Sequence, residues 1–532
     1  MSASIELTGA HFVGSERVAG SGAAFSAMDA ASGLTLEPRY FDADEALVAR
    51  ACDRAAAAED AYAAIDGAAR AAFLRRIAAE ILALGDVLVE RVAMETALPI
   101  ARIQTERART MFQLETFARV IEEGSWVDAR IDRADRERKP QPKPDLRAML
   151  RPIGPVAVFG ASNFPLAYSV AGGDTASALA VGCPVVVKAH SMHPGTSELV
   201  ALAIDAAARA TGMPDGVFSM VHGKGHAVGA ALVRHSAIAA VGFTGSFAGG
   251  SALCRLASER HTPIPVFAEM GSVNPVVVLP NALAQRGATI GQAVAVSSLL
   301  ACGQFCTSPG MVLYCEGAGA SDLVEAIRAT FAASPAGVMV HADIRDAYER
   351  SVATFAAQDG VHLAAEASVS DASAAARGRG RVFATDAASA LRSGRLREEL
   401  YGPALLLVRC SNTRELEQVI AAMHGHLTAT VHGDDADCQQ HAALLRSLEK
   451  RVGRVVHNGV PTGVEVCAAM QHGGPWPASS DSRFTAVGAR AILRWVRPVA
   501  WQDAPQHALP SALRDGNPLG ILRTIDGEVG KR

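Results

Sequence analysis

The sequence predicts an α/β protein whose central sheet is parallel. From Gly154 onward, short apolar runs rich in Val recur, and each ends near a Gly, Pro or charged residue. Helical segments such as 196–212 separate these runs. Strands that alternate with helices are typical of βαβ units with helices on both faces of the sheet. The expected strands lie within 154–160, 184–189, 218–223, 240–245, 265–271 and 274–280.

The region before the first of these strands is predicted to be helical. Residues 44–124 carry Ala, Leu, Arg and Glu at helical spacing, so several amphipathic helices are expected there. Between Asp128 and Arg151 the chain becomes charged and proline-rich, which suits an exposed ribbon or connector. A second alternating region covers 281–473, and the tail after Pro498 is expected to be irregular.

The composition favours a globular protein with a small-molecule partner. The chain has 532 residues, 49% of them hydrophobic, which is enough for more than one core. Its 50 basic and 54 acidic residues leave a formal charge of −4. We therefore expect no nucleic-acid partner and no anionic-membrane partner. The uncharged stretches 152–173 and 287–315 contain Gly, Pro, Ser, Asn or Gln, so both are expected to be buried interior.

The cysteines and the N-terminus indicate a reducing compartment. Nine cysteines are scattered without zinc-binding spacing. The segment MSASIELTGAHFVG has neither the basic nor the apolar region of a secretory signal, so a cytoplasmic location is expected. His190 and His193 lie close together in a predicted loop, but further ligands are not near in sequence, and we assign no metal site.

Three polar residues stand at the ends of apolar runs. Cys306 lies in the segment GQFCTSPG, and a cysteine in such a bend can expose its sulfur. Glu269 ends the apolar strand in VFAEMG and is a candidate general base toward water, although a strand-end acid can equally bond to nearby amides. Asn163 follows the first strand, where its carboxamide can donate to an oxyanion or form an Asx turn.

Five motifs in a fixed order resemble the aldehyde dehydrogenase superfamily. They are GASNFP, FTGS with a glycine three residues after the serine, AEMGSVNP, GQFCTSPG and EELYGP. The resemblance extends over nearly the whole chain. The segments VAGGDTASALAVGCPVVVKAHSMHPGTSE and NGVPTGVEVCAAMQHGGPWPASSDSR are similar to the branch that contains α-ketoglutarate semialdehyde (2,5-dioxovalerate) dehydrogenases.

The resemblance implies that an aldehyde is oxidised to a carboxylate on a cysteine. Cys306 would add to the aldehyde carbon as a thiolate, and the Asn163 amide and the Cys306 N–H would hold the thiohemiacetal alkoxide. After hydride leaves for the nicotinamide, Glu269 would activate the water that hydrolyses the thioester. No histidine is obviously paired with Cys306 in the sequence, so we expect its reactivity to depend on bound cofactor.

The resemblance also implies where a dinucleotide binds. Gly245, Ser246 and Gly249, at the start of a helix, would present backbone N–H groups to the pyrophosphate. Glu399 would hold the nicotinamide ribose, and Tyr401 would pack beside the nicotinamide ring. A simpler interpretation of Glu399 is a surface acid.

The adenosine side of this site predicts NADP as the cofactor, with NAD less favoured. Lys188 resembles the family lysine that bonds the adenosine ribose, although it can also be an ordinary strand-end lysine. NAD-preferring relatives often have a glutamate three residues later, where this chain has Ser191. A carboxylate would repel a 2′-phosphate, whereas a hydroxyl can donate to it and Lys188 can neutralise it. Lys224 is a further candidate phosphate ligand.

The expected substrate is α-ketoglutarate semialdehyde, which would yield 2-oxoglutarate. By resemblance, Phe164 and the late segment around Val466 and His472 would line the aldehyde tunnel. Arg107 and Arg109 lie two apart on a helix, so at most one reaches the pocket, and Arg107 is our candidate carboxylate ligand. Pairing with surface acids is the alternative for these arginines.

Two alternative activities remain open, and one motif departs from the family pattern. The substrate is alternatively a medium-chain or aromatic aldehyde, or the thioester passes to coenzyme A. Glu269 argues against acyl transfer, because that reaction needs no base for hydrolysis.

Gly271-Ser272 replaces the usual pair of glycines after the base motif, which is expected to alter the loop near Glu269.

The resemblance divides the chain into four parts. It implies a Rossmann-like cofactor-binding domain, a second α/β domain that carries Cys306, a small oligomerisation arm and a tail. The expected bounds are 1–124 with 150–272, then 273–485, then 125–149 with 486–501, and finally 502–532. Because such an arm adds strands to a neighbouring subunit, a homodimer or homotetramer is expected.

Overall fold

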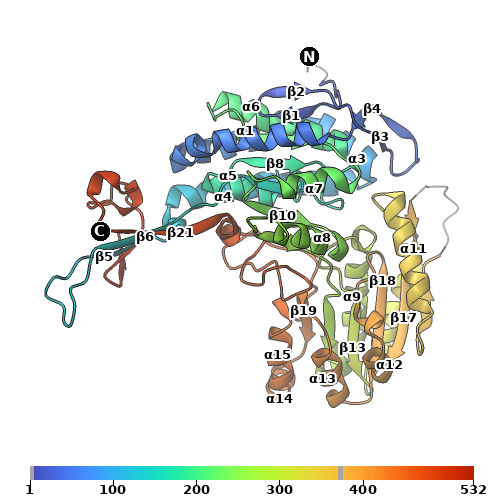
Figure 1. The fold of residues 1–532 in the computed structure, drawn as a ribbon. Helices are drawn as coiled ribbons and strands as arrows, with labels where there is room; N and C mark the ends of the chain where they lie inside the picture. The colour runs from blue at the N-terminus through green and yellow to red at the C-terminus, as the bar shows by residue number, and fades with distance from the viewer. Residues whose placement is uncertain (1–4, 369–375, 532) are drawn as a thin grey trace.

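The computed structural model describes residues 5–368 and 376–531 and confirms an α/β fold. Two seven-stranded sheets form the body, and a smaller five-stranded sheet projects from it (Figure 1). We call these the first sheet, the second sheet and the arm. In the described residues, no helix is both long and apolar enough to cross a membrane.

The first sheet has five parallel strands and an antiparallel edge. Its strand order is β11-β10-β7-β8-β9-β1-β2. The strands are β1 (His11–Val13), β2 (Glu16–Val18), β7 (Val156–Phe159), β8 (Val185–Lys188), β9 (Phe218–Val221), β10 (Ala240–Thr244) and β11 (Val266–Glu269). Because β8 and β9 lie on one side of β7 while β10 and β11 lie on the other, the order reverses between β7 and β10. Ligands of open α/β sheets bind outside the carboxyl ends of the strands at such a point.

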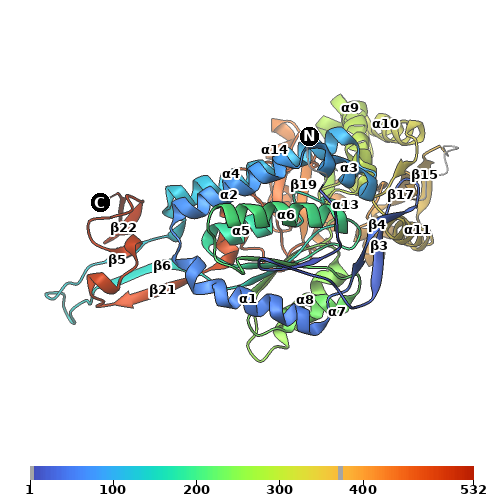
Figure 2. The same ribbon diagram turned by 90° about the horizontal axis from the view of Figure 1, so that it is seen from above.

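Helices cover both faces of the first sheet, as Figure 2 shows. The predicted helices of 44–124 are confirmed as α1 (Glu45–Ala64), α2 (Gly67–Ala83), α3 (Gly85–Thr96) and α4 (Ile100–Glu123). One face carries α2, α4, α5 (Gly173–Val181) and α6 (Pro194–Ala210). The other carries α1, α7 (His226–Arg234) and α8 (Phe247–Ser258). Asp44 and Asp66 cap α1 and α2 through their side chains, which fixes where these helices begin.

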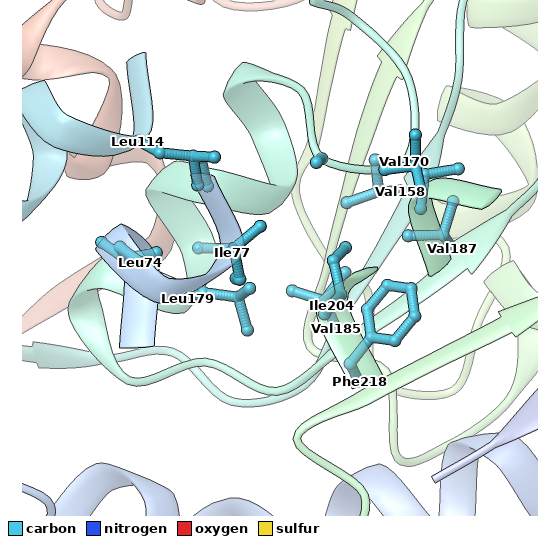
Figure 3. Close-up of a cluster of buried hydrophobic side chains, with 14 of the residues drawn as sticks. Leu74, Ile77, Leu114, Val158, Val170, Leu179, Val185, Val187, Ile204 and Phe218 are labelled. Carbon is cyan, nitrogen blue, oxygen red and sulfur yellow. The ribbon is translucent and has the colours of Figure 1, made fainter. Parts of the chain in front are cut away.

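The main core lies between this first helix layer and the sheet. Figure 3 shows Leu74 and Ile77 of α2 facing Leu179 of α5, with Ile204 of α6 and Val185 of β8 beside them. All five side chains are buried. Burial of each such side chain contributes roughly 1.5–3 kcal/mol. This packing holds the carboxyl ends of the strands in place.

The second sheet is also mostly parallel, in the order β15-β17-β18-β13-β12-β19-β20. Its strands are β12 (Pro275–Val278), β13 (Met311–Cys315), β15 (His362–Glu366), β17 (Arg381–Asp386), β18 (Ala404–Cys410), β19 (His426–His432) and β20 (Val452–His457). Alternate strand residues pack against α9 (Pro280–Leu299) and α10 (Ala320–Ala333). The other residues pack against α11 (Ala342–Ala356), α12 (Ala387–Arg392), α13 (Thr413–Ala421) and α15 (Ala442–Glu449). The short helix α14 (Asp435–Gln440) precedes α15.

Shorter elements complete the body. Two further antiparallel pairs are β3 (Ala24–Met28) with β4 (Thr35–Phe41), and β14 (Gly337–Val338) with β16 (Arg377–Gly378). Six 3-10 helices connect larger elements: Ser125–Val127, Leu300–Gly303, Gly394–Arg397, Ala489–Trp495, Gln506–Ala508 and Ser511–Leu513.

The arm corrects two expectations about the end of the chain. Its strand order is β21-β6-β5-β22-β23, with β5 (Arg130–Asp132), β6 (Leu146–Pro152), β21 (Val496–Gln502), β22 (Arg523–Ile525) and β23 (Glu528–Gly530). The prediction of an irregular tail after Pro498 is therefore wrong. Leu509, Leu513 and Ile521 form a buried cluster with Ile131 and Met149, and this burial orders the segment.

The second correction concerns residues 486–495, which were expected to belong to the arm strand. Ala489–Trp495 instead form a 3-10 helix that packs on the first sheet. The Trp495 ring is fully buried, stacks edge-on against Phe267 and donates from Nε1 to the Ser177 hydroxyl at 2.8 Å. The arm strand begins only at Val496.

Candidate active site

Cys306 lies in a loop with a constrained backbone. The chain leaves α9 through Leu300–Gly303 and then reaches the half-buried Cys306. Ala301, Cys302 and Gly303 all have positive φ angles, of 49°, 56° and 67°. A side chain at Gly303 would lie 2.1 Å from the Gly402 carbonyl, so only glycine fits there. The thiol of Cys302 packs inward, and burial raises its pKa to about 12, which suits a packing role.

The sulfur of Cys306 has a histidine partner, so the expectation that none is paired with it is wrong. His472 Nε2 lies 3.2 Å from Cys306 Sγ, and His472 Nδ1 lies 3.2 Å from Glu269 Oε2. The other carboxylate oxygen of Glu269 accepts from the Ser479 hydroxyl at 3.0 Å. The imidazole and the carboxylate are both buried. The structure thus lines up a thiol, an imidazole and a carboxylate.

The pKa of His472 is raised well above its ordinary value. Burial opposes the charged ring, but the negative charge on Cys306, the phenol of Tyr168 and hydrogen bonds to Cys306 and Glu269 outweigh it. Nε2 of this imidazole is within hydrogen-bond distance of the sulfur, whose thiolate is the nucleophilic form of cysteine.

Asn163 is brought to the same place by the loop that follows β7. Its side-chain amide donates to the backbone carbonyl of Gln304 at 2.8 Å, two residues before the sulfur. The backbone carbonyl of Asn163 accepts from Arg102 Nη2 at 3.0 Å. The buried amide has two N–H groups, and the bond to Gln304 occupies one of them.

Ser272, which replaces a glycine of the family motif that follows Glu269, anchors the loop of Cys306. The Ser272 hydroxyl donates to Asn274 Oδ1 at 2.7 Å and accepts from the Leu427 N–H at 2.9 Å. Asn274 Nδ2 then donates to the carbonyls of Cys306 and Ser308, both at 2.9 Å. The serine thus fixes the loop through hydrogen bonds that a glycine lacks.

Aromatic residues flank the sulfur on the side of the expected aldehyde tunnel. The ring of Phe164 lies 5.3 Å from that of Phe305 and 5.2 Å from that of Tyr168, measured between centroids. The Tyr168 ring lies 6.1 Å from the ring of His472. Val466 is buried in the late segment.

The two predicted arginines point to different places. Arg107 donates to the Gly85 carbonyl at 2.9 Å, at the start of α3, so the structure does not bring this candidate carboxylate ligand to the site. Arg109 donates to the Val464 carbonyl and, at 3.4 Å, to the Tyr168 hydroxyl, so it supports the tunnel wall. Residues two apart on a helix face different directions, which explains the divergence.

The carboxyl ends of β10 and β11 meet at the N-terminus of α8. Gly245 and Ser246 are exposed, and the Ser246 hydroxyl caps α8 by accepting from Gly249 N–H at 3.2 Å. The Gly245 N–H donates to the Glu269 carbonyl at 3.0 Å, which connects this turn to the end of β11. The free N–H groups of such a helix end suit a phosphate.

The end of β8 presents a lysine without an acidic partner. Burial lowers the pKa of Lys188 to about 8, and the charge of Asp42 offsets this only in part. In the part of the chain that the structure describes, Lys188 forms no ion pair. Ser191 lies half-buried in the next loop, and Lys224 is exposed with its backbone N–H on Asp42 Oδ1. This donor set fits a phosphate-bearing adenosine.

Glu399 and Tyr401 lie beside the Cys306 loop. A pocket lined in part by Ser272, Gly303 and Glu399 opens there. The Glu399 carboxylate lies so close to Gly271 that a side chain at Gly271 would be 2.3 Å from Oε2. Burial raises the pKa of Glu399 to about 7, against the opposing effect of the Ser272 N–H. The Tyr401 hydroxyl donates to the Gln304 carbonyl at 3.4 Å.

Comparison with known proteins assigns this constellation to a family. The model of the aldehyde dehydrogenase family matches residues 37–484. The chain belongs to the aldehyde dehydrogenase family. It is 50% identical over 528 residues to alpha-ketoglutaric semialdehyde dehydrogenase 2 of Azospirillum brasilense, covering 99% of this chain and 100% of that protein. It is 45% identical over 460 residues to alpha-ketoglutaric semialdehyde dehydrogenase of Acinetobacter baylyi, covering 86% of each.

A solved structure shows that this dehydrogenase shares the family fold. NADP-dependent glyceraldehyde-3-phosphate dehydrogenase from Bacillus halodurans, complexed with NADP, superposes with a TM-score of 0.77 at 19% identity. The match covers 94% of this chain and 100% of that chain. At that identity the likeness concerns the fold alone.

The aldehyde dehydrogenase site contains contacts that the sequence did not predict. Arg102 on Asn163, Ser479 on Glu269 and the His472 bridge all join residues far apart in the chain. One signal for Arg102 was available, because it lies seven residues before Arg109 and therefore on the same face of α4. Within residues 5–368 and 376–531, no cluster of His, Cys, Asp or Glu has the arrangement of a metal site.

Proposed function

We propose that this aldehyde dehydrogenase oxidises α-ketoglutarate semialdehyde to 2-oxoglutarate with NADP. The observation that carries the proposal is the alignment of Cys306, His472 and Glu269, in a chain half identical to a protein of that name over its whole length. A second relative with the same activity in its name, 45% identical, supports the same substrate. An α-keto acid substrate is anionic, and arginines of α4 lie at this site.

The chain's own residues account for each chemical step. The Cys306 thiolate adds to the aldehyde carbon, and the resulting alkoxide accepts from the free N–H of the Asn163 amide and from the Cys306 N–H. When bound, oxidised NADP supplies the acceptor for the hydride that leaves this carbon. A water molecule whose proton passes to the pair of Glu269 and His472 then attacks the thioester, and the C–S bond breaks to release the carboxylate.

We propose that the dinucleotide lies across the carboxyl edge of the first sheet. The turn formed by Gly245, Ser246 and Gly249 would hold the pyrophosphate, because the positive end of the α8 dipole faces solvent there. Glu399 would accept from the nicotinamide ribose, with Tyr401 beside the ring.

The preference for NADP depends on the adenosine side of this site. Lys188 and Ser191, with Lys224, would bind the 2′-phosphate, because no carboxylate of this loop opposes it. The test is kcat/KM for NADP against NAD in the wild type and in Ser191→Glu. The wild type is expected to favour NADP and the variant NAD. A wild type that favours NAD rejects the NADP assignment.

The domain division stays part of the proposal. Residues 1–124 with 150–272 would bind the cofactor, 273–485 would carry the nucleophile, and the arm would join subunits into a homodimer or homotetramer. The buried packing of 489–495 on the first sheet moves the start of the late arm segment to Val496.

A spectrophotometric panel tests the reaction. Formation of NADPH is followed with α-ketoglutarate semialdehyde, hexanal and benzaldehyde, each with and without coenzyme A. Fastest turnover with the α-keto semialdehyde, unchanged by coenzyme A, is expected. A higher kcat/KM for hexanal or benzaldehyde rejects the substrate, and a requirement for coenzyme A rejects hydrolysis.

A further inference from the structure

Hydrogen bonds hold both the ring and the backbone of His472, so the fold fixes the distance from its imidazole to the Cys306 sulfur. Nδ1 faces Glu269 Oε2 at 3.2 Å, while the His472 backbone N–H donates to the Thr485 hydroxyl at 2.9 Å. Thr485 in turn donates to the Val487 carbonyl at 2.9 Å. Nε2 is left facing Cys306 Sγ at 3.2 Å, which is hydrogen-bond distance for sulfur.

The partners decide which ring nitrogen carries the proton. A carboxylate only accepts hydrogen bonds, so Nδ1 must donate to Glu269. Nε2 is then the basic nitrogen, and it can take the thiol proton from Cys306. In that transfer the S–H bond breaks and an N–H bond forms. The product is a thiolate beside an imidazolium whose two N–H groups both have anionic acceptors.

We propose that His472 is a catalytic residue that holds Cys306 as a thiolate before any cofactor binds, and that Glu269 positions and charges this imidazole. This inference goes beyond the proposed roles, and it replaces the expectation from the sequence that the reactivity of Cys306 depends on bound cofactor. It concerns the nucleophile alone, so it does not require α-ketoglutarate semialdehyde to be the substrate.

Charged and titratable groups around the pair come from four further elements. The Tyr168 ring packs beside His472, and Arg109 of α4 donates to its hydroxyl at 3.4 Å. The positive charge of Arg454, from β20, acts on Cys306 and Tyr168. Glu269 is on the far side of the ring. The two arginines favour the thiolate, and the carboxylate, which bonds to Nδ1, favours the imidazolium.

The same imidazole has a second use after hydride transfer. Once the sulfur is part of a thioester, its negative charge is gone, and the imidazolium loses the partner that favoured its proton. The imidazolium then releases its Nε2 proton to solvent, and the neutral Nε2, next to the thioester, can take a proton from the attacking water. Cleavage of the C–S bond regenerates the thiolate, so each turnover returns the pair to its starting state.

The test measures alkylation of Cys306 by iodoacetamide without cofactor between pH 6 and 9, with modification at residue 306 read by mass spectrometry. The wild type is expected to react at a nearly constant rate over this range, because the thiolate is already formed. His472→Gln is expected to react at least about tenfold more slowly at pH 6.5, with a rate that rises toward pH 9 as for an ordinary thiol. The exposed Cys467 is an internal reference in each digest.

Two outcomes would overturn the inference. One is a wild-type rate at pH 6.5 that is slow alone and rises only when NADP is added. The other is an unchanged pH profile in a folded His472→Gln protein, as judged by circular dichroism. His362→Gln, on the exposed part of β15, is the matched control for the substitution itself. The wild-type comparison needs no variant, so a misfolded variant does not prevent a decision.

A second inference concerns Arg102, which lies against the rings of Phe164 and Phe305. Its guanidinium carbon is 4.9 Å from the ring centroid of Phe164 and 4.6 Å from that of Phe305, which directly precedes Cys306. Nη2 donates to the Asn163 carbonyl. Nη1 is buried, and the described residues offer it no acceptor.

Arg102 is half-buried, and within the described residues it forms no ion pair with an acid. Glu106, one turn along α4, uses one oxygen to accept from the N–H groups of Leu166 and Ala167, at 2.8 and 3.0 Å. Burial raises the pKa of Glu106 despite these bonds and the charges of Arg102 and Arg109, which weakens its ability to neutralise Arg102. An unpaired donor on a buried guanidinium is costly, and an anionic ligand removes that cost.

We infer that Arg102 Nη1 binds the carboxylate at the far end of the substrate from the aldehyde. This inference rests on the proposed function. The two rings hold the guanidinium plane, which a lysine cannot reproduce. Arg107 and Arg109 are less suited, because their donors already meet carbonyls or a hydroxyl.

The test compares kcat/KM for α-ketoglutarate semialdehyde with that for pentanal, a neutral aldehyde of the same chain length. The wild type is expected to prefer the anionic substrate. Arg102→Met, which keeps the packing between the rings, is expected to lose about 30- to 100-fold of that preference, mainly in KM. Arg107→Met on the same helix is the matched control and is expected to keep it.

The outcomes separate the inference from the proposed function. A wild type without the preference rejects the anionic substrate itself. If the wild type prefers the anionic aldehyde and Arg102→Met retains that preference, Arg102 is rejected as the ligand. An equal loss of kcat/KM for both aldehydes also rejects Arg102 as the ligand. That result would mean that Arg102 only supports Asn163.

Discussion

Asn274 donates its side-chain amide to the backbone carbonyl of Cys306 at 2.9 Å. Its own oxygen accepts from the hydroxyls of Ser272 and Thr428, at 2.7 and 3.1 Å. Asn274 has a φ of 51°, so its backbone is held in the left-handed region by these contacts. The loop that carries the nucleophile is therefore fixed to the residues just before β12.

Removal of the Ser272 hydroxyl tests this fixation. Ser272→Ala loses the bonds to Asn274 and to the Leu427 N–H, so the Cys306 loop gains freedom. We expect kcat to fall about tenfold, which corresponds to about 1.4 kcal/mol, with little change in the KM for NADP. Steady-state kinetics measures both. Ser258→Ala, whose hydroxyl bonds only within α8, is the control, and an unchanged kcat in Ser272→Ala would show that Asn274 is held without this serine.

The strands β7 to β12 were predictable because they are short apolar runs that are largely buried on both faces. Runs such as 156–159 and 185–187 are continuously apolar, which is the pattern of a buried parallel strand. The strands β22 and β23 have three residues each and no such pattern. β22 forms because β5, almost 400 residues earlier, gives it a partner, and β23 then pairs with β22. Pairing of that kind is not visible in local sequence.

The site was predictable where motifs are local. Asn163, Glu269 and Cys306 each end a recognisable segment, and the fold brings their loops together. The contact between Cys306 and His472 joins residues 166 positions apart, so no spacing rule reveals it. The tunnel-lining role first expected for His472 reflected its segment correctly but missed its partners. The roles of these residues remain predictions that the kinetic experiments decide.

Binding of NADP is expected to weaken as the pH rises above about 8. Below that value the unliganded Lys188 is protonated, and above it the buried amine loses its charge. Binding a phosphate then requires uptake of a proton, so Kd rises by up to about tenfold per pH unit. Burial also lowers the pKa of the nearby His190, His193 and His222, so these rings are neutral in this range.

Fluorescence titration between pH 7 and 9.5 measures this effect. Lys188→Arg stays charged throughout, so its affinity for NADP should not follow pH. NAD, which lacks the 2′-phosphate, should show a weaker dependence in the wild type. A flat wild-type profile for NADP would place the phosphate away from Lys188.

Glu95 is expected to be a major determinant of stability. It is fully buried in α3 and accepts from the N–H groups of Gly195 and Thr196, both at 2.8 Å, and from Arg91 at 3.0 Å. Glu95→Ala leaves the N-terminus of α6 and a buried guanidinium without their anion, so a loss of about 3–5 kcal/mol is expected. Urea denaturation followed by circular dichroism should show a lower midpoint. Glu90→Ala, exposed on the same helix, should leave the midpoint unchanged.

The free edge of β21 is the expected contact between subunits, and its prolines show which groups face outward. In the antiparallel ladder with β6, Pro498 pairs with Leu150 and Pro152 pairs with Val496. Proline cannot donate, so these pairs are the non-hydrogen-bonded ones, and the pairs alternate along the strand. Ala500, two residues after Pro498, therefore directs its N–H away from β6. β21 is an edge strand of its sheet, so this donor is free to meet a second subunit.

Ala500→Pro removes that donor and leaves the ladder with β6 intact. If subunits join along this edge, light scattering should show a lower mass for the variant at micromolar concentration, whereas Ala500→Gly, which keeps the N–H, should retain the wild-type mass. The Cys306 centre lies in the body of the chain, so alkylation of Cys306 should be unchanged in the dissociated variant. An unaltered mass for Ala500→Pro would mean that subunits do not pair through β21, because a lost donor and a proline ring on the joining edge are both incompatible with a continuous sheet.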